Sequence, residues 1–126
     1  MPYDIRYNMD GYVEMVHDGV IASKHITSII TAVMSAVKEN GCNLFLGDYR
    51  RTDLQLSMGM LYEVPKQVYS EAQRLHLKMG DFKRALVVSE VLYEKFKFFE
   101  LVSLNRMQNV RVFTNMDDAK AWLLGK

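Results

Sequence analysis

Leu44-Phe45-Leu46-Gly47-Asp48 is the stretch that decides the fold, because it is an apolar run that ends abruptly in glycine and aspartate. Two similar runs follow it, Ala85-Leu86-Val87-Val88 and Val110-Arg111-Val112-Phe113. Short apolar runs of this kind suit strands that are covered on both faces. Helical sequence separates each run from the next, and that alternation is typical of parallel strands joined by right-handed crossovers.

The residues before this stretch predict a hairpin and a helix. Apolar residues alternate with polar ones on both sides of Asp10-Gly11, at Tyr3, Ile5, Tyr7, Val13 and Met15. Asp10-Gly11 suits a tight turn, so the two strands should be antiparallel. After an expected polar turn at 17–19, apolar residues recur every three or four positions from Ser23 to Asn40, which predicts a helix. Ser23 could cap its start, and Gly41 could end it.

Four further helices are expected between and after the apolar runs. Pro65 divides the irregular stretch from Tyr49 to Met79, and we predict two helices that meet at an angle there, because proline is costly inside a helix. A helix from Val91 to Asn105 precedes the last run, and a short one starts at about Asp117. The whole chain, residues 1–126, is thus predicted to be one α/β domain with a single mixed, mostly parallel sheet of about five strands.

Composition excludes several classes of protein. Sixteen Lys and Arg residues against fifteen Asp and Glu give a formal net charge of +1, so no overall field would attract nucleic acid or anionic lipid. No apolar run is long enough to cross a bilayer. Met1 to Arg6 show neither the apolar stretch of a secretory signal nor the composition of a transit peptide, so we expect a cytoplasmic location. A protein of this size needs no structural metal or disulfide.

No motif predicts catalysis, a metal or a cofactor. His17, His25 and His76 do not stand at ligand spacing, and His17 and His25 are expected to be solvated. Cys42, the only cysteine, is expected to fill a buried or half-buried space. Phosphate-binding, dinucleotide-binding and nucleophile-elbow motifs are missing from the sequence.

The order of the predicted elements and several local sequences resemble one known family. The sequence from Leu44 to Arg50, and the ending with Asn105-Arg106, Val110 to Phe113 and Trp122-Leu123, resemble the SpoIIAA-like family, which is related to STAS domains and to bacterial anti-sigma-factor antagonists. The resemblance covers Tyr3 to Leu124 and implies the fold. It also implies Ser57 as a candidate phospho-acceptor, although the Asp-Ser pair of the antagonists is absent and Met58 follows Ser57.

Polar residues follow the first apolar run, where ligands bind in open parallel sheets. The candidates for contact with an anion or a protein partner are Asp48, Arg50, Arg51 and Asp53. Arginine and the N-terminus of a helix at Ser57 could receive a phosphate or carboxylate. Alternatively, Ser57, Ser89 and Asp117 cap helices, and the two arginines pair with Asp48 or Asp53.

An apolar segment follows Ser57 and contains more hydrophobic side chains than one helical face needs. It includes Met58, Met60, Leu61, Tyr62, Val64 and Tyr69. Such a segment could be a flap over an apolar pocket or a surface that binds a second copy of the chain. It could also be a helix pair that packs on its own sheet.

The sequence is therefore compatible with three functions, which we rank from the most to the least favoured. The first is a non-enzymatic regulatory or protein-interaction module of STAS-like fold, which binds a protein partner or itself as a homodimer. The second is a carrier of a small apolar or lipid-like molecule, as in related folds of the CRAL-TRIO type. An enzyme comes third, with the edge formed by Asp48, Arg50 and Ser57 as its best location.

Overall fold

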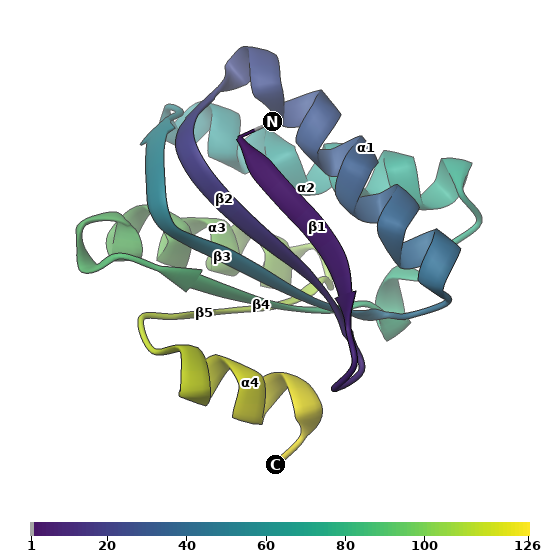
Figure 1. Cartoon of the computed structure of the whole chain (residues 1–126). Helices are drawn as coiled ribbons and strands as arrows, with labels where there is room; N and C mark the ends of the chain where they lie inside the picture. The colour runs from purple at the N-terminus through teal and green to yellow at the C-terminus, as the bar shows by residue number, and fades with distance from the viewer. Residues whose placement is uncertain (1) are drawn as a thin grey trace.

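The computed structural model describes residues 2–126, and this part of the chain forms an α/β structure (Figure 1). Its strands and α-helices are, in chain order, β1 (Tyr3–Asn8), β2 (Tyr12–Ala22), α1 (Ser23–Asn40), β3 (Leu44–Gln55), α2 (Met58–Arg74), β4 (Lys83–Val88), α3 (Tyr93–Asn105), β5 (Asn109–Phe113) and α4 (Met116–Leu124). Two short 3₁₀ turns, Met79–Asp81 and Glu90–Leu92, precede β4 and α3.

The sheet has the order β1-β2-β3-β4-β5, with β1 antiparallel to β2 and all other neighbours parallel. This confirms the predicted mixed, mostly parallel sheet and its opening hairpin. Gly11 has the positive φ of 107° that the turn requires, and its N–H bonds to the carbonyl oxygen of Asn8 at 2.9 Å.

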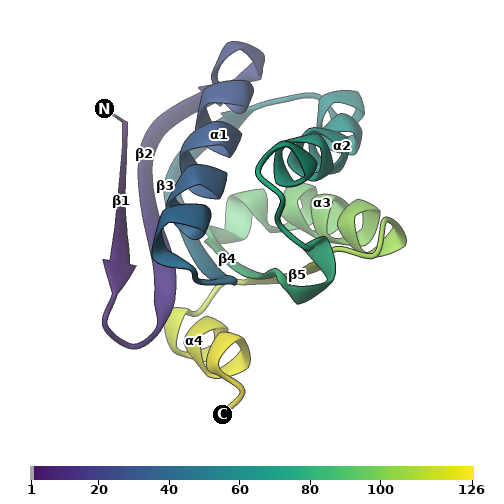
Figure 2. The same ribbon diagram turned by 90° about the vertical axis from the view of Figure 1, so that its right-hand side faces the viewer.

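The strand order explains how the helices are layered. Each crossover from β2 to β5 steps to the next strand in the same direction, and right-handed crossovers then place α1, α2 and α3 on one face of the sheet. α4 follows the last strand and packs on the opposite face, which Figure 2 shows edge-on. The larger core, between the sheet and the three helices, contains Met15, Phe45, Leu86 and Val110.

Two strands are longer than the sequence predicted. β2 continues through residues 17–19, where we expected a turn, and β3 continues seven residues beyond Asp48. The physical reason is a β-bulge: Val16 pairs with Asp48 and Asp18 with Arg51, so Tyr49 and Arg50 lie opposite the single residue His17. The extra residue breaks the two-residue period of β3. The residues of β3 that face the larger core are odd-numbered before it and even-numbered after it, as at Phe45 and Leu54.

The prediction of two helices around Pro65 is wrong, because α2 is continuous from Met58 to Arg74. Pro65 lies inside it and is buried, between the buried residues Leu61 and Val68. Packing on both sides of the proline therefore holds one helix despite the missing N–H. The Pro65 carbonyl oxygen accepts a bond from Gln108 Nε2 at 2.8 Å, which ties the middle of α2 to the start of β5.

The helix ends differ partly from the predicted caps. Gly41 ends α1 in the left-handed conformation as predicted, with a φ of 57°. Ser23 is not the cap of α1, since Ala22 holds that position and its N–H donates to His25 Nδ1 at 3.0 Å. Asn115, not Asp117, caps α4, and Ser89 makes no capping bond. Over residues 2–126, no helix combines the length and the apolar character that crossing a membrane requires.

Candidate functional site

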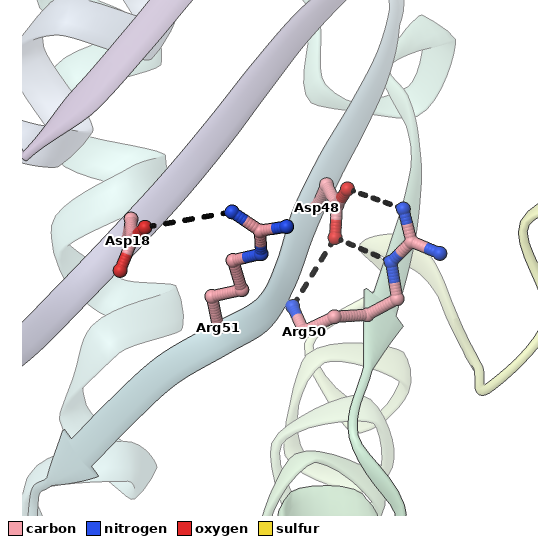
Figure 3. Close-up of polar contacts among 4 residues, drawn as sticks. All are labelled: Asp18, Asp48, Arg50 and Arg51. Carbon is pink, nitrogen blue, oxygen red and sulfur yellow. Dashed lines mark hydrogen bonds and ion pairs between the residues drawn. The ribbon is translucent and has the colours of Figure 1, made fainter.

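Asp48 and Arg50 form the tightest part of the predicted polar site (Figure 3). Asp48 Oδ1 accepts from the Arg50 backbone N–H at 3.1 Å and from Nε at 2.9 Å, while Oδ2 accepts from Nη2 at 2.8 Å. Burial raises the pKa of the Asp48 carboxyl, but the Arg50 bonds more than offset this and hold the pKa below its ordinary value. Both oxygens of Asp48 are therefore engaged within the chain.

The other predicted polar residues do not converge on this pair. Arg51 reaches across to Asp18 on β2, with Nη1 and Oδ2 3.9 Å apart (Figure 3), so its expected pairing with Asp48 or Asp53 is wrong. Asp53 instead accepts from the Gln55 amide at 3.1 Å. The four predicted residues, Asp48, Arg50, Arg51 and Asp53, all lie along β3 and not in a loop after it, because the strand continues past the bulge.

Ser57 is the N-cap of α2, as the alternative interpretation predicted. Its Oγ accepts from the Met60 backbone N–H at 3.2 Å. Capping accounts for the serine at this position without any ligand. Its phosphorylation stays a prediction.

The apolar segment is divided between two faces of α2. Met58, Met60, Tyr62 and Tyr69 are exposed, whereas Leu61 is buried and Val64 is half-buried against the core. The second group lines a cavity, and the first group lies on the surface. The flap and the docking surface of the two sequence hypotheses thus correspond to opposite faces of one helix.

The cavity lies between α1, α2, α3 and the sheet and has a volume of about 100 Å³. Its walls are almost entirely apolar, with contributions from Ile30 of α1, Leu61 and Val64 of α2, Phe96 of α3 and Leu86 of β4. Ile26, Ile30, Val64 and Tyr49 are the half-buried members of this lining. The side of the cavity nearest to solvent is therefore between α1 and α2.

Arg84 and Tyr49 are the two polar side chains in the cavity wall. Arg84 is only 6% exposed, and its Nη2 donates to Gln108 Oε1 at 2.6 Å. Its Nε is buried and has no hydrogen-bond partner among the described residues. Burial raises the pKa of the Tyr49 hydroxyl to about 12, so this group is neutral at physiological pH.

Sequence analysis missed Arg84, since the predicted strand began at Ala85. The strand begins at Lys83, and the alternation of Phe82, Arg84, Leu86 and Val88 places the arginine on the face that carries the larger core. That alternation was a signal in the sequence. It was hidden because two adjacent basic residues are typical of an exposed strand end.

His17, His25 and Cys42 are all at least partly buried. The expectation that His17 is solvated is wrong: it is 1% exposed, and its Nδ1 lies 2.8 Å from the Thr52 hydroxyl oxygen. His25 is half-buried and accepts from the Ala22 N–H. Cys42 is half-buried, as predicted, with Sγ 3.4 Å from the Gly11 carbonyl oxygen. Within residues 2–126, no three acidic, histidine or cysteine side chains are grouped to hold a metal ion.

Comparison with known proteins supports the fold. A solved structure from Shewanella loihica PV-4, described as an uncharacterized protein from the DUF3478 family with a SpoIIAA-like fold, is 19% identical to this chain. The match covers 96% of this chain and 91% of that one, with a TM-score of 0.54. This chain has a SpoIIAA-like fold. No family model and no curated protein matches the sequence. The resemblance noted in the sequence is thereby confirmed at the level of the fold, and the function of the SpoIIAA-like chain has to be argued from its own site.

Proposed function

We propose that this SpoIIAA-like chain is a non-enzymatic binding module that holds a small, mainly apolar molecule in the cavity beneath α1 and α2. The observation that carries the proposal is a cavity of about 100 Å³ with an apolar lining inside the larger core. Protein interiors rarely contain voids larger than a water molecule. A cavity of about 150 Å³ with similar walls is known to bind benzene, so this one suits a ligand of a few carbon atoms.

The walls of the cavity favour binding over catalysis. Among its lining residues there is no carboxylate, imidazole, thiol or amine that could act as a nucleophile or general base. The Tyr49 hydroxyl, with a pKa raised to about 12 by burial, is a poor base at neutral pH. The proposal therefore reverses the order of the first two sequence hypotheses and keeps the enzyme last.

Two measurements test this function. Native mass spectrometry of freshly purified protein, repeated under denaturing conditions, should show a small mass that is lost on denaturation. Benzene, added as a neutral probe, should shift the methyl NMR signals of Ile30 and Val64. Val64→Phe should fill the cavity and abolish the shifts, while Val20→Phe, the same change at an exposed valine outside the cavity, should not. A protein that retains no ligand and does not respond to benzene would overturn the proposal.

A second candidate, self-association, is favoured by the exposed side of α2 and α3. Met58 is 45% exposed and lies in one shallow depression with Phe98 and Leu101 of α3. Tyr62 is exposed farther along α2, and the centre of its ring lies 5.4 Å from the guanidinium of Arg106 at the end of α3. The rim of the depression carries both signs of charge, from Glu94, Lys95, Lys97 and Glu100, which suits a second copy better than a strongly charged partner.

Sedimentation velocity tests self-association directly. We expect a dimer whose dissociation constant increases when Met58→Glu and Leu101→Glu are combined. The same change at Val91, which is 91% exposed but lies outside the depression, should leave the dimer intact. A monomer at all accessible concentrations would exclude this second function and leave the first unaffected.

A further inference from the structure

Arg84 occupies an apolar part of the sheet. It lies on the interior strand β4, where its Cα pairs with Phe45 of β3 on one side and Val110 of β5 on the other. The residues two positions before and after it on the same strand are Phe82 and Leu86, which are both 4% exposed. An arginine with apolar neighbours on all four sides is unusual, because a buried charge is normally paired.

The chain gives this guanidinium only partial compensation. No described carboxylate forms an ion pair with it, and the single hydrogen bond at Nη2 goes to the neutral amide of Gln108. The rings of Phe82 and Phe99 lie 5.3 Å and 5.9 Å from Cζ, and their faces stabilise a cation weakly. Burial lowers the pKa of Arg84 to about 10, so the side chain remains charged at neutral pH.

The cavity beside Arg84 is where a counter-charge could be supplied. Removing an ion from water without an opposite charge is costly relative to the marginal stability of a domain. A carboxylate that entered the cavity would pair with the cation and accept from the unpartnered Nε. The Tyr49 hydroxyl in the same wall is neutral and able to donate to such an anion.

We infer that the ligand of this cavity is a small apolar monocarboxylate, with its carboxylate on Arg84 and its hydrocarbon part among the side chains of α1, α2 and α3. This inference rests on the proposed function and adds the chemical class of the ligand. A single charge is matched by a single arginine. A phosphate would carry a second charge, and the lining contains no other cation to receive it.

Matched pairs of an acid and an alcohol test the inference. Propanoate, butanoate and pentanoate are compared with the alcohols of the same chain length by calorimetry and by the shift in melting temperature. In the wild type we expect at least one acid to bind about tenfold or more tightly than its alcohol, because buried charge-assisted hydrogen bonds are stronger than neutral ones. Arg84→Met should remove this preference, so that the acid no longer binds more tightly than its alcohol.

A second variant covers the case in which Arg84→Met does not fold. Gln108→Glu would place a carboxylate of the chain itself on Arg84, and it should weaken binding of the acid without weakening that of the alcohol. Equal affinity for acid and alcohol in the wild type would overturn the inference and leave the proposed function standing. Loss of both ligands from a folded Arg84→Met variant would also overturn it, because Arg84 would then only shape the cavity. Failure of every probe to bind the wild type would overturn both.

Discussion

The Nδ1 atom of His17 lies 2.8 Å from the Thr52 hydroxyl oxygen, and both side chains are buried on the face of the sheet beneath α1. The bond joins β2 to β3 immediately after the bulge at Tyr49 and Arg50. The other ring nitrogen of His17, Nε2, is buried and has no partner among the described residues. A neutral imidazole tolerates this position, whereas a protonated one would bury an unsatisfied charge.

We predict that His17 makes the fold less stable in mild acid. Burial is the main cause that lowers the pKa of His17 below its ordinary value of 6.5. The unfolded chain therefore binds more protons as the pH falls below 6.5, and the free energy of unfolding decreases over that range. Urea unfolding at about pH 8 and about pH 5 measures the change. His17→Asn should reduce it, and His76→Asn, at an exposed histidine, should not. Equal pH dependence in both variants would contradict this role of His17.

Asp48 should stabilise the fold at neutral pH and cease to do so in strong acid. Its folded pKa is lower than the ordinary value of 3.8, so its contribution is complete above that pH and is lost as the pH falls through the folded pKa. Because Arg50 is half exposed, we expect Asp48→Asn to cost about 1 kcal/mol at pH 7. The difference from wild type should shrink as the pH falls below 3.8. Asp53→Asn, at an exposed carboxylate on the same strand, is the control, and a difference that persists in acid would refute the prediction.

The sequence predicted the parts of the fold in which the residue pattern is regular. The run Leu44-Phe45-Leu46 identified β3 because both faces of that strand are covered. The bulge hid the rest of the strand, since it shifts the buried positions from Phe45 to Thr52 and Leu54 by an odd number of residues. The expected site at the strand end, with Asp48 and Arg50, was misplaced for that reason.

The alternation of Phe82, Arg84, Leu86 and Val88 indicated that Arg84 faces the core, but its residue type indicated the surface. A basic residue before an apolar strand is usually exposed, and its burial here depends on neighbours from distant parts of the chain, Phe45 and Val110. Pro65 is a similar case. The helix stays continuous through Pro65 because of the packing of Leu61 and Val68 and the bond from Gln108. Helix propensity, which depends on local sequence, does not include these contacts.

Ser57 should contribute to stability as a cap. Replacing an N-cap serine by alanine costs about 1 kcal/mol, because the Met60 N–H loses its acceptor. Ser57→Ala should therefore lower the free energy of unfolding by about that amount, and Ser57→Asp should retain most of it. Ser70→Ala is the matched control, since Ser70 is exposed in the interior of the same helix, where alanine is the better residue. If both alanine variants behave alike in urea unfolding, the cap does not stabilise α2.

Gly47 should control the shape of the cavity through Tyr49. A Cβ atom at Gly47 would lie 2.5 Å from Cε2 of Tyr49 and 3.1 Å from Cε2 of Phe45, and both of these rings line the cavity. The Tyr49 ring cannot move freely, because it packs at 5.4 Å against the ring of Phe96. Gly47→Ala should therefore cost about 1–3 kcal/mol, as overpacking of a core does, and weaken binding of benzene.

A double-mutant cycle separates this clash from a general effect of the extra methyl group. Tyr49→Leu removes the ring atoms nearest to the new Cβ, so Gly47→Ala should cost less in that background, with a coupling of about 0.5 kcal/mol or more. Gly59→Ala is the control with the opposite sign: its Cβ meets only Ser57 Oγ, at 3.8 Å, and alanine favours the helix there. Additive costs for Gly47→Ala and Tyr49→Leu would mean that the two residues do not interact, and that Gly47 does not hold the Tyr49 ring at the wall of the cavity.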